Sequence, residues 1–251
     1  MATSDVATTS MPKRPEFIND EIYHISSRSV GDTVIFEEES DFYRGIFSIY
    51  EFNNSDYVSI WKRRREIMFQ KRQRRTLPEG LPEEVAVNDT RNKLVEILAF
   101  SFMPNHLHLI LKQLKNNGIV EFMKKVNGGY AKYFNEKYDR KGHLFNKFYP
   151  VHISNEDQLK NAFTYVHANL ISLIEPGWKE NGIKDVAKVR EFLENNKRHS
   201  YPDYIGKKNF PSVTERDFLL KIMEGAEGCR LNVNNWLLHK KEIKDLRDIF
   251  I

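Results

Sequence analysis

The hydrophobic and polar positions of the chain fall into short periodic segments. Residues 21–30 alternate between two faces with a period of two, which is typical of a β-strand. Residues 93–100 and 106–111 are apolar runs rich in strand-forming side chains. The turn residues 103–105, which include a proline and an asparagine, separate these two runs. The pattern therefore predicts one strand followed later by a hairpin.

Two further segments have helical periodicity. In residues 38–52 the apolar positions recur at helical spacing after an acidic start that suits a helix N-terminus. Residues 119–138 repeat apolar side chains every three or four positions. Residues 144–153 then predict a closing strand. The order β-α-β-β-α-β predicts an α+β, ferredoxin-like antiparallel sheet with both helices on one face and the other face open to a substrate.

Beyond this unit the chain adds helices. A capping sequence at 154–157 precedes an expected helix over 158–174. Residues 1–16 are polar and predict a flexible tail. We expect residues 17–206 to form one domain and residues 207–251 to form a C-terminal helical extension.

Composition narrows the class of protein. The chain has 251 residues, of which 40% are hydrophobic and 29% charged, with a net charge of +4. No apolar run approaches the roughly 20 residues that span a bilayer, and the first residues lack the order of a signal peptide. We therefore expect a cytoplasmic protein without a membrane partner. A single cysteine, Cys229, excludes an internal disulfide and a cysteine-cluster zinc site.

Positive charge is concentrated in an insertion at about 55–90. Residues 61–75 contain eight lysines and arginines interleaved with Trp61 and Phe69. Blocks of like charge are often solvated faces. They also bind phosphate backbones, while aromatic rings can stack on bases. The sequence leaves both interpretations open.

The third strand carries the best clue to chemistry. His106 and His108 lie on one face of it, about 7 Å apart along the strand at the usual rise per residue. The leucines between and after them lie on the opposite face. Two imidazoles at this spacing can bind one metal ion. Histidines on a half-exposed sheet face are more often solvated or bonded to a carbonyl, so the spacing alone does not decide.

Two short sequence motifs favour a metal site over solvated histidines. MPNHLHLIL at 103–111 resembles the His-hydrophobic-His motif of the single-tyrosine HUH transposases, which include the REP-associated tyrosine transposases. YVHAN at 165–169 resembles their helix with a nucleophilic tyrosine and, one turn later, an amide. This chain departs from the family pattern at Leu170, where many relatives have proline, and at Lys147, where arginine is more familiar.

The resemblance implies site residues and an activity. It assigns Tyr165 as the nucleophile and His106, His108 and Asn169 as ligands of Mg²⁺ or Mn²⁺. His24 would then lie beside this site as a structural or substrate-contacting residue. The implied activity is cleavage and transfer of single-stranded DNA through a 5′-phosphotyrosine, with hairpin-forming repeat ends among the candidate partners. The protein would act as a monomer or a homodimer.

The residues expected to contact DNA are basic. They are Lys62, Arg63, Arg64, Arg65, Lys124, Lys125, Lys132 and Lys147. Position in the motif alone separates Tyr165 from four other tyrosines that precede the expected helix. These are Tyr130, Tyr133, Tyr138 and Tyr149.

Two other classes of function stay open at this point. A non-catalytic ferredoxin-like module could bind RNA or single-stranded DNA on its open face through aromatic and basic residues. A small-molecule metalloenzyme could use the same histidines, although it would not need the basic segment at 61–75.

Overall fold

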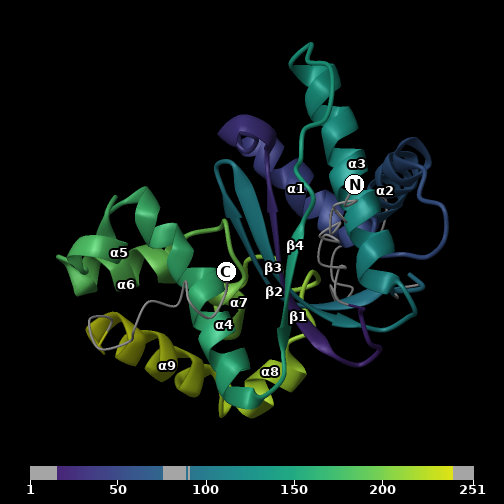
Figure 1. Cartoon of the computed structure of the whole chain (residues 1–251). Coiled ribbons are helices and arrows are strands. Elements are labelled where there is room, and N and C mark those ends of the chain that lie inside the picture. The colour runs from purple at the N-terminus through teal and green to yellow at the C-terminus, as the bar shows by residue number, and fades with distance from the viewer. Residues whose placement is uncertain (1–15, 76–88, 90, 240–251) are drawn as a thin grey trace, which may run out of the picture.

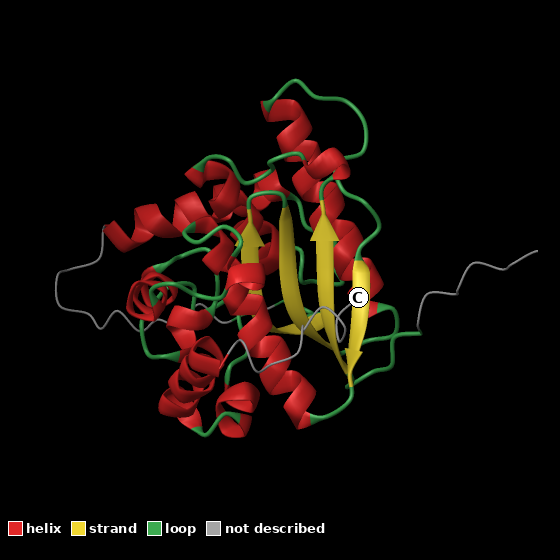
Figure 2. Ribbon diagram, turned by 60° about the vertical axis from the view of Figure 1, so that its left-hand side comes forward, coloured by secondary structure: helices red, strands yellow, loops and turns green. Residues whose placement is uncertain are grey.

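A four-stranded antiparallel sheet organises the protein. The computed structural model describes residues 16–75, 89 and 91–239. The strands are β1 (Ile22–Arg28), β2 (Val95–Met103), β3 (His106–Gln113) and β4 (Tyr149–Ile153). Their order is β2-β3-β1-β4, and every pairing is antiparallel (Figure 2). This order confirms the predicted ferredoxin-like α+β fold.

Helices α1 (Glu39–Glu51) and α3 (Gly118–Lys137) cover one face of the sheet. The acidic start of α1 forms a capping box, in which Glu38 and Asp41 satisfy each other's backbone donors. The two helices contact each other closely at Gly129. A Cβ atom there would lie 2.3 Å from the Phe52 ring, so the crossing requires glycine.

The core under α1 and α3 is mainly apolar, with the buried polar residues Ser27 and Gln113 at the ends of its strands. Leu107, Leu109 and Leu111 of β3 point into it, as the strand alternation predicted. Tyr23 and Ile25 of β1 lie beside them with almost no exposed surface.

The opposite face is covered rather than open. Helix α4 (Glu156–Ala168) packs against β2 and β3. The α-helix stops six residues earlier than predicted and tightens into a 3-10 helix, η2 (Asn169–Leu173), as helix ends often do. The remaining helices complete this layer around α4: α5 (Trp178–Asn181), α6 (Val186–Asn195), α7 (Tyr201–Tyr204), α8 (Asp217–Ile222) and α9 (Gly225–His239).

The two helical groups flank the sheet from opposite sides. In Figure 1, α2 and α3 lie to the right of the strands and α4, α5, α6 and α9 to the left. The C-terminal helices α8 and α9 bury Leu219, Val233 and Leu237 in the same core as α4. The described helices of the extension, α8 and α9, thus pack in the layer of the helix that carries Tyr165.

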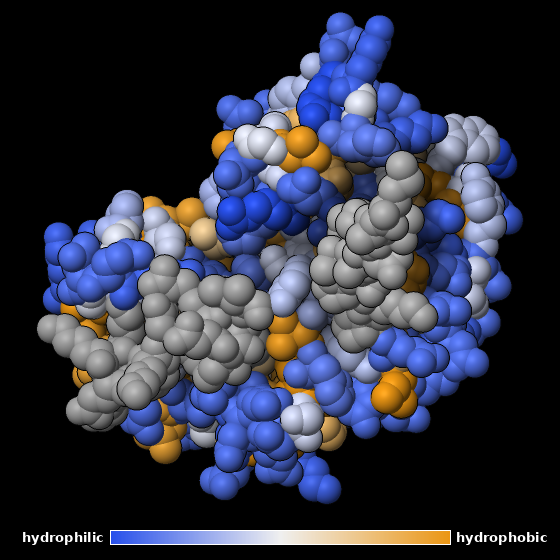
Figure 3. All heavy atoms as spheres, viewed as in Figure 1, coloured by the Kyte–Doolittle hydropathy of each residue, from blue (hydrophilic) through white to orange (hydrophobic). Residues whose placement is uncertain are grey.

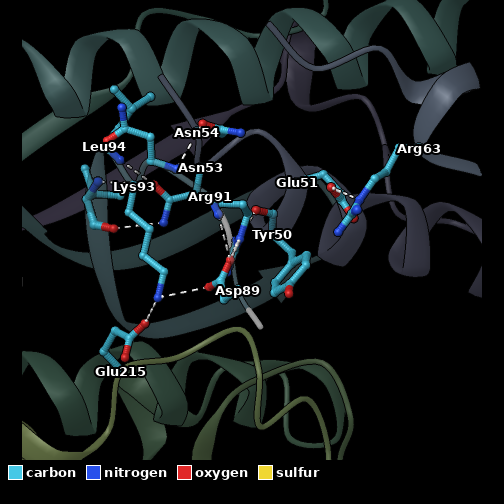
Figure 4. Close-up of polar contacts among 12 residues, drawn as sticks. Tyr50, Glu51, Asn53, Asn54, Arg63, Asp89, Arg91, Lys93, Leu94 and Glu215 are labelled. Atoms are coloured by element: carbon cyan, nitrogen blue, oxygen red, sulfur yellow. Dashed lines mark hydrogen bonds and ion pairs between the residues drawn. The ribbon is translucent and has the colours of Figure 1, made fainter. Parts of the chain in front are cut away.

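Part of the expected basic insertion forms helix α2 (Ile60–Arg75). Residues 76–88 and 90 of the insertion lie outside the described residues, as do residues 1–15 of the expected tail and 240–251 of the extension. A polar network anchors the chain after the insertion (Figure 4). There Arg91 lies over the Tyr50 ring and pairs with Asp89, while Lys93 pairs with both Asp89 and Glu215.

The closing strand is shorter than predicted. Regular pairing with β1 begins at Tyr149, whereas the prediction began at residue 144. β1 continues to Arg28, but its regular pairing with β4 ends at Ser26, opposite Tyr149. Beyond this pair a single bridge from Ser29 to Phe145, one residue out of register, extends the ladder before the 3-10 turn η1 (Val30–Asp32).

One face of the molecule is mostly polar. In the view of Figure 3, hydrophilic residues dominate and hydrophobic ones form small separate patches. Among the described residues, no helix combines the length and apolar character needed to cross a membrane.

Candidate active site

Side chains of two neighbouring strands form the floor of the site. In the antiparallel register of β1 and β3, Ser26 lies opposite His108 and Arg28 lies opposite His106. Opposed residues of a sheet point to the same face, and so do residues two apart on one strand. His24 therefore joins this set, which faces α4 rather than the apolar core under α1 and α3.

His24 and His108 form a hydrogen-bonded pair. Their Nε2 and Nδ1 atoms are 3.0 Å apart, one donating and the other accepting, and the rings stack at 5.1 Å. Only 3% of His24 and 5% of His108 is exposed, so His108 is more buried than the sequence suggested. Burial lowers the pKa of His24 to about 4 and that of His108 well below its ordinary value. Both rings are neutral at pH 7.

His106 is fixed in a similar way. Its Nδ1 lies 2.6 Å from the Asn105 amide oxygen, to which it donates when protonated there. Burial lowers the pKa of His106 to about 4, with further lowering by the positive charges of Arg28 and Lys179. In His106 and His108 alike, Nδ1 has a partner, and when Nδ1 carries the proton and donates it, the lone pair of Nε2 can bind a ligand. This is how metal-binding histidines are commonly oriented.

Helix α4 brings the tyrosine to this floor. Asn155 caps the helix by accepting a hydrogen bond from the Gln158 backbone N–H at 2.9 Å, as the capping sequence predicted. Phe163 and Val166 are buried in the core, which turns the adjacent face with Tyr165 and Asn169 toward the histidines. The Tyr165 ring lies 5.7 Å from the ring of His24 and 5.7 Å from that of His108.

These residues enclose a cavity of about 610 Å³. Its lining consists of His24, Ser26, Arg28, Met103, His106, His108, Tyr149, Tyr165, Asn169, Ser172 and Lys179. All four residues that the sequence assigned to catalysis and metal binding are among them. The lining contains two cations and no carboxylate, so the cavity favours an anionic ligand.

The donor set suits a divalent metal only in part. Two neutral imidazoles and the amide oxygen of Asn169 can ligate Mn²⁺ or Mg²⁺, and both histidines are held neutral as ligation requires. Hard cations such as these prefer oxygen ligands, which a phosphate would supply. In the described part of the chain, no group of three or more His, Cys, Asp or Glu side chains could hold a metal ion.

Three of the competing tyrosines lie away from the site. Tyr130 donates its hydroxyl to the Ile35 carbonyl on the α1/α3 side of the sheet. Tyr133 and Tyr138 both donate to the Asp41 carboxylate. Tyr149 is different, because it lines the cavity and is half exposed.

The basic residues expected to contact DNA have varied surroundings. Lys62 and Arg65 are exposed, and Arg65 lies over the Trp61 ring. Arg63 is instead paired with Glu51 at 3.0 Å. The Arg64 side chain lies outside the described ones. All of these residues belong to α2, so they lie apart from the cavity lining.

The expected contacts on α3 and before β4 also differ. Lys124 and Lys147 are exposed. Lys132 is exposed beside Glu136, at 3.8 Å. Lys125 binds Glu121 at 2.9 Å and the backbone carbonyl of Asn54 at 2.6 Å, so internal partners offset its charge.

The sequence did not assign Arg28 or Lys179 to the site. Lys179 donates to the Asn169 amide oxygen at 3.2 Å, and its ammonium lies 5.5 Å from the centre of the Tyr165 ring. It follows Asn169 by ten residues and belongs to no motif. Arg28 ends β1 and pairs with Asp32. In the sequence, the position of Arg28 two residues after Ser26 and four after His24 was the signal that it shares their face of the strand.

In this structure a His-x-His strand of a ferredoxin-like sheet faces a helix-borne tyrosine across the cavity. Residues 53–169 match the family model described as "Transposase IS200 like". This segment is similar to the IS200-like transposases, in agreement with the resemblance seen in the sequence. The segment includes His106, His108, Tyr165 and Asn169. β1 and His24 precede it.

The similarity of the chain to solved structures is low. A REP-associated tyrosine transposase bound to a REP hairpin is 12% identical, with a TM-score of 0.43 over 83% of this chain and 93% of that one. A bacterial tRNA(His) guanylyltransferase-like protein in complex with ATP is 8% identical, with a TM-score of 0.36 over 74% of this chain and 72% of that one. No curated protein matches the chain in sequence.

Proposed function

We propose that the protein is a transposase-like endonuclease and strand transferase of single-stranded DNA, with Tyr165 as its nucleophile. One observation carries the proposal. Tyr165, from α4, lies beside the His24 and His108 rings in a cavity that holds cations and no carboxylate. A phosphodiester is the anionic group that a tyrosine nucleophile in such a cavity can attack.

The proposed reaction exchanges one phosphate ester for another. The Tyr165 oxygen loses its proton and forms a bond to the scissile phosphorus, while the bond from phosphorus to the 3′ oxygen breaks. The products are a 5′-phosphotyrosine and a 3′-hydroxyl that has gained a proton. The ester energy is retained, so a second 3′-hydroxyl can attack and join a new strand.

His106, His108 and Asn169 would hold the metal. When bound, Mg²⁺ or Mn²⁺ would supply Lewis acidity at the non-bridging phosphate oxygens. The protein's own contribution is to keep both imidazoles neutral through burial and to fix their orientation through Asn105 and His24. Because all three ligands are uncharged, we expect weak metal binding in the absence of DNA.

The strand outside the cavity would follow exposed positive charge. Lys62 and Arg65 on α2, with the exposed rings of Trp61 and Phe69, suit a phosphate backbone and stacked bases. Lys124, Lys132 and Lys147 are further exposed contacts. Arg63 and Lys125 contribute less, because Glu51 and Glu121 offset their charges. We extend the proposal to hairpin-forming repeat ends as substrates.

Replacing the nucleophile tests the proposal. Tyr165→Phe should abolish the covalent adduct with a labelled single-stranded oligonucleotide in Mn²⁺, because only the attacking hydroxyl is lost. Binding of the same oligonucleotide should stay near normal. Adducts are measured on denaturing gels and binding by fluorescence anisotropy. Tyr149→Phe is the matched control, since Tyr149 lines the same cavity, and it should keep adduct formation.

Two other results would redirect the proposal. An adduct that persists in Tyr165→Phe and disappears in Tyr149→Phe would make Tyr149 the nucleophile. Binding without any adduct in the unaltered protein, across a pool of oligonucleotides, would instead favour a non-catalytic module that binds single-stranded nucleic acid.

A further inference from the structure

Lys179 occupies a distinctive place in the cavity. It lies on the short helix α5, after the turn that follows η2. Its ammonium donates to the Asn169 amide oxygen at 3.2 Å and lies 5.5 Å from the centre of the Tyr165 ring. The side chain therefore sits between the proposed nucleophile and one proposed metal ligand.

The charge around Lys179 is suited to an anion. The cavity lining has no carboxylate, and the other cation in it, Arg28, is paired with Asp32 at 3.3 Å. Asn169 is 96% buried, and its amide nitrogen has no hydrogen-bond partner in the part of the chain that the structure describes. An ammonium group and a spare N–H donor thus occur together beside Tyr165. Phosphate oxygens accept hydrogen bonds from both kinds of donor.

The same lysine opposes a metal ion. Asn169 can offer its amide oxygen to a metal, yet Lys179 already donates to that oxygen. Lys179 also lines the same cavity as His106 and His108, so its positive charge faces the position that a metal on these ligands would occupy. A divalent cation entering the cavity is repelled by this charge and must compete for this ligand.

We propose that Lys179 binds the scissile phosphate beside Tyr165 and, without DNA, holds the Asn169 oxygen against the metal. This inference rests on the proposed function. Lys179 stays protonated and neither forms nor breaks a covalent bond. Its charge stabilises the negative charge that develops on the phosphate oxygens as Tyr165 attacks. Once the phosphate is bound, it draws the ammonium away and frees Asn169 for the metal.

Two effects of opposite sign follow for Lys179→Met. At saturating Mn²⁺, adduct formation should slow on the order of 100-fold, as for the loss of one stabilising donor in other active sites. Without DNA, the same variant should bind Mn²⁺ several-fold more tightly, because a repelling charge and a competitor for Asn169 are gone. A lysine with a merely structural role would not improve metal binding when removed.

The experiment uses the full chain and two separate measurements. Adduct rates are followed with a labelled oligonucleotide, and Mn²⁺ binding to DNA-free protein is followed by the loss of the free-ion EPR signal. Lys179→Gln repeats both measurements with a shorter neutral side chain. Lys179→Arg, which keeps the charge, should retain most of the rate and the weak Mn²⁺ binding. Lys188→Met is the matched control, since Lys188 is exposed on α6 and outside the cavity lining.

Either measurement can overturn the inference. Adducts formed by Lys179→Met and Lys179→Gln at the control rate would remove Lys179 from the phosphate. Mn²⁺ binding that is unchanged or weaker in both variants would remove its competition for Asn169. If the unaltered protein forms no adduct with any oligonucleotide, the proposed function fails. The DNA-free Mn²⁺ titration still decides on the competition.

Discussion

The two faces of the sheet differ in the polarity of the side chains that they bury. The face under α1 and α3 is mainly apolar, with Leu107, Leu109 and Leu111 of β3 all within the core and polar side chains only at strand ends such as Ser27 and Gln113. The α4 face is apolar at Ile110 and changes to polar at His108 and His106 along the same strand. The same strand, β3, therefore supplies leucines to the core on one side and Ile110 together with two cavity-lining histidines on the other.

Helix α4 likewise has an apolar side that packs against the sheet and a side that lines the cavity. Its buried positions, which include Phe163 and Val166, hold it against the sheet. Tyr165, between them in sequence, points into the cavity instead. The apolar half of this face thus fixes the position of the tyrosine relative to the histidines. The face under α1 and α3 supports the fold without contributing to the cavity lining.

The largest effects should come from the polar half of the α4 face. His106→Ala should eliminate metal-dependent cleavage with little change in the unfolding midpoint, because His106 is only partly buried. Asn169→Ala should keep activity but raise the Mn²⁺ concentration required. Adduct rates over an Mn²⁺ series measure both. His152→Ala, on the exposed edge strand β4, is the control. Full activity of His106→Ala would contradict the assigned metal site.

The next effect separates the two faces directly. Leu109 neighbours His108 on β3 but points into the opposite core and has no exposed surface. Leu109→Ala should lower the free energy of unfolding by about 2–5 kcal/mol, measured by urea denaturation. The adduct rate per folded molecule should stay near normal. Loss of activity in fully folded Leu109→Ala would show that the two faces are not independent.

Adjacent glycines on α3 give a smaller, paired effect. Gly129→Ala would place a methyl group 2.3 Å from the Phe52 ring, and overpacking of this kind typically costs about 1–3 kcal/mol. At Gly128 nothing lies within 4 Å, and alanine is favoured over glycine in a helix by up to about 1 kcal/mol. Thermal melts should therefore shift in opposite directions. Equal shifts would mean that α1 and α3 do not contact each other at Gly129.

The smallest effect concerns α2, outside both faces. Replacing Lys62 and Arg65 together by alanine should weaken DNA binding at all sequences. It should also reduce the slope of log affinity against log salt by roughly 1 to 1.5, at about 0.7 per phosphate contact on a single strand. Arg63 is left unchanged because it pairs with Glu51. The control replaces Lys184 and Lys188, both exposed beyond the cavity. An unaltered slope would make α2 a solvated face.

Much of the fold followed from local patterns. Period-two alternation placed Leu109 and His108 on opposite faces, and the four-residue step placed Tyr165 and Asn169 on one helical face. These patterns depend on backbone geometry within a single element. Where the predictions were wrong, contacts with other strands and helices decided the structure. The closing strand starts at Tyr149 because its regular pairing with β1 ends at Ser26, and the bridge from Ser29 to Phe145 is one residue out of that register. The α4 face is covered by helices whose docking cannot be read from the periodicity of any single segment.

The sequence by itself determined the β-α-β-β-α-β order, the placement of His106 and His108 on one face of a strand, and the motif that singles out Tyr165. Only the tertiary structure decided which groups meet in the cavity. It joined His24 to His108 across two strands and brought Lys179 to Asn169 from a separate helix. The physical reason is that periodicity reports only which way a side chain points from its own element. Contacts between elements depend on how their buried faces pack.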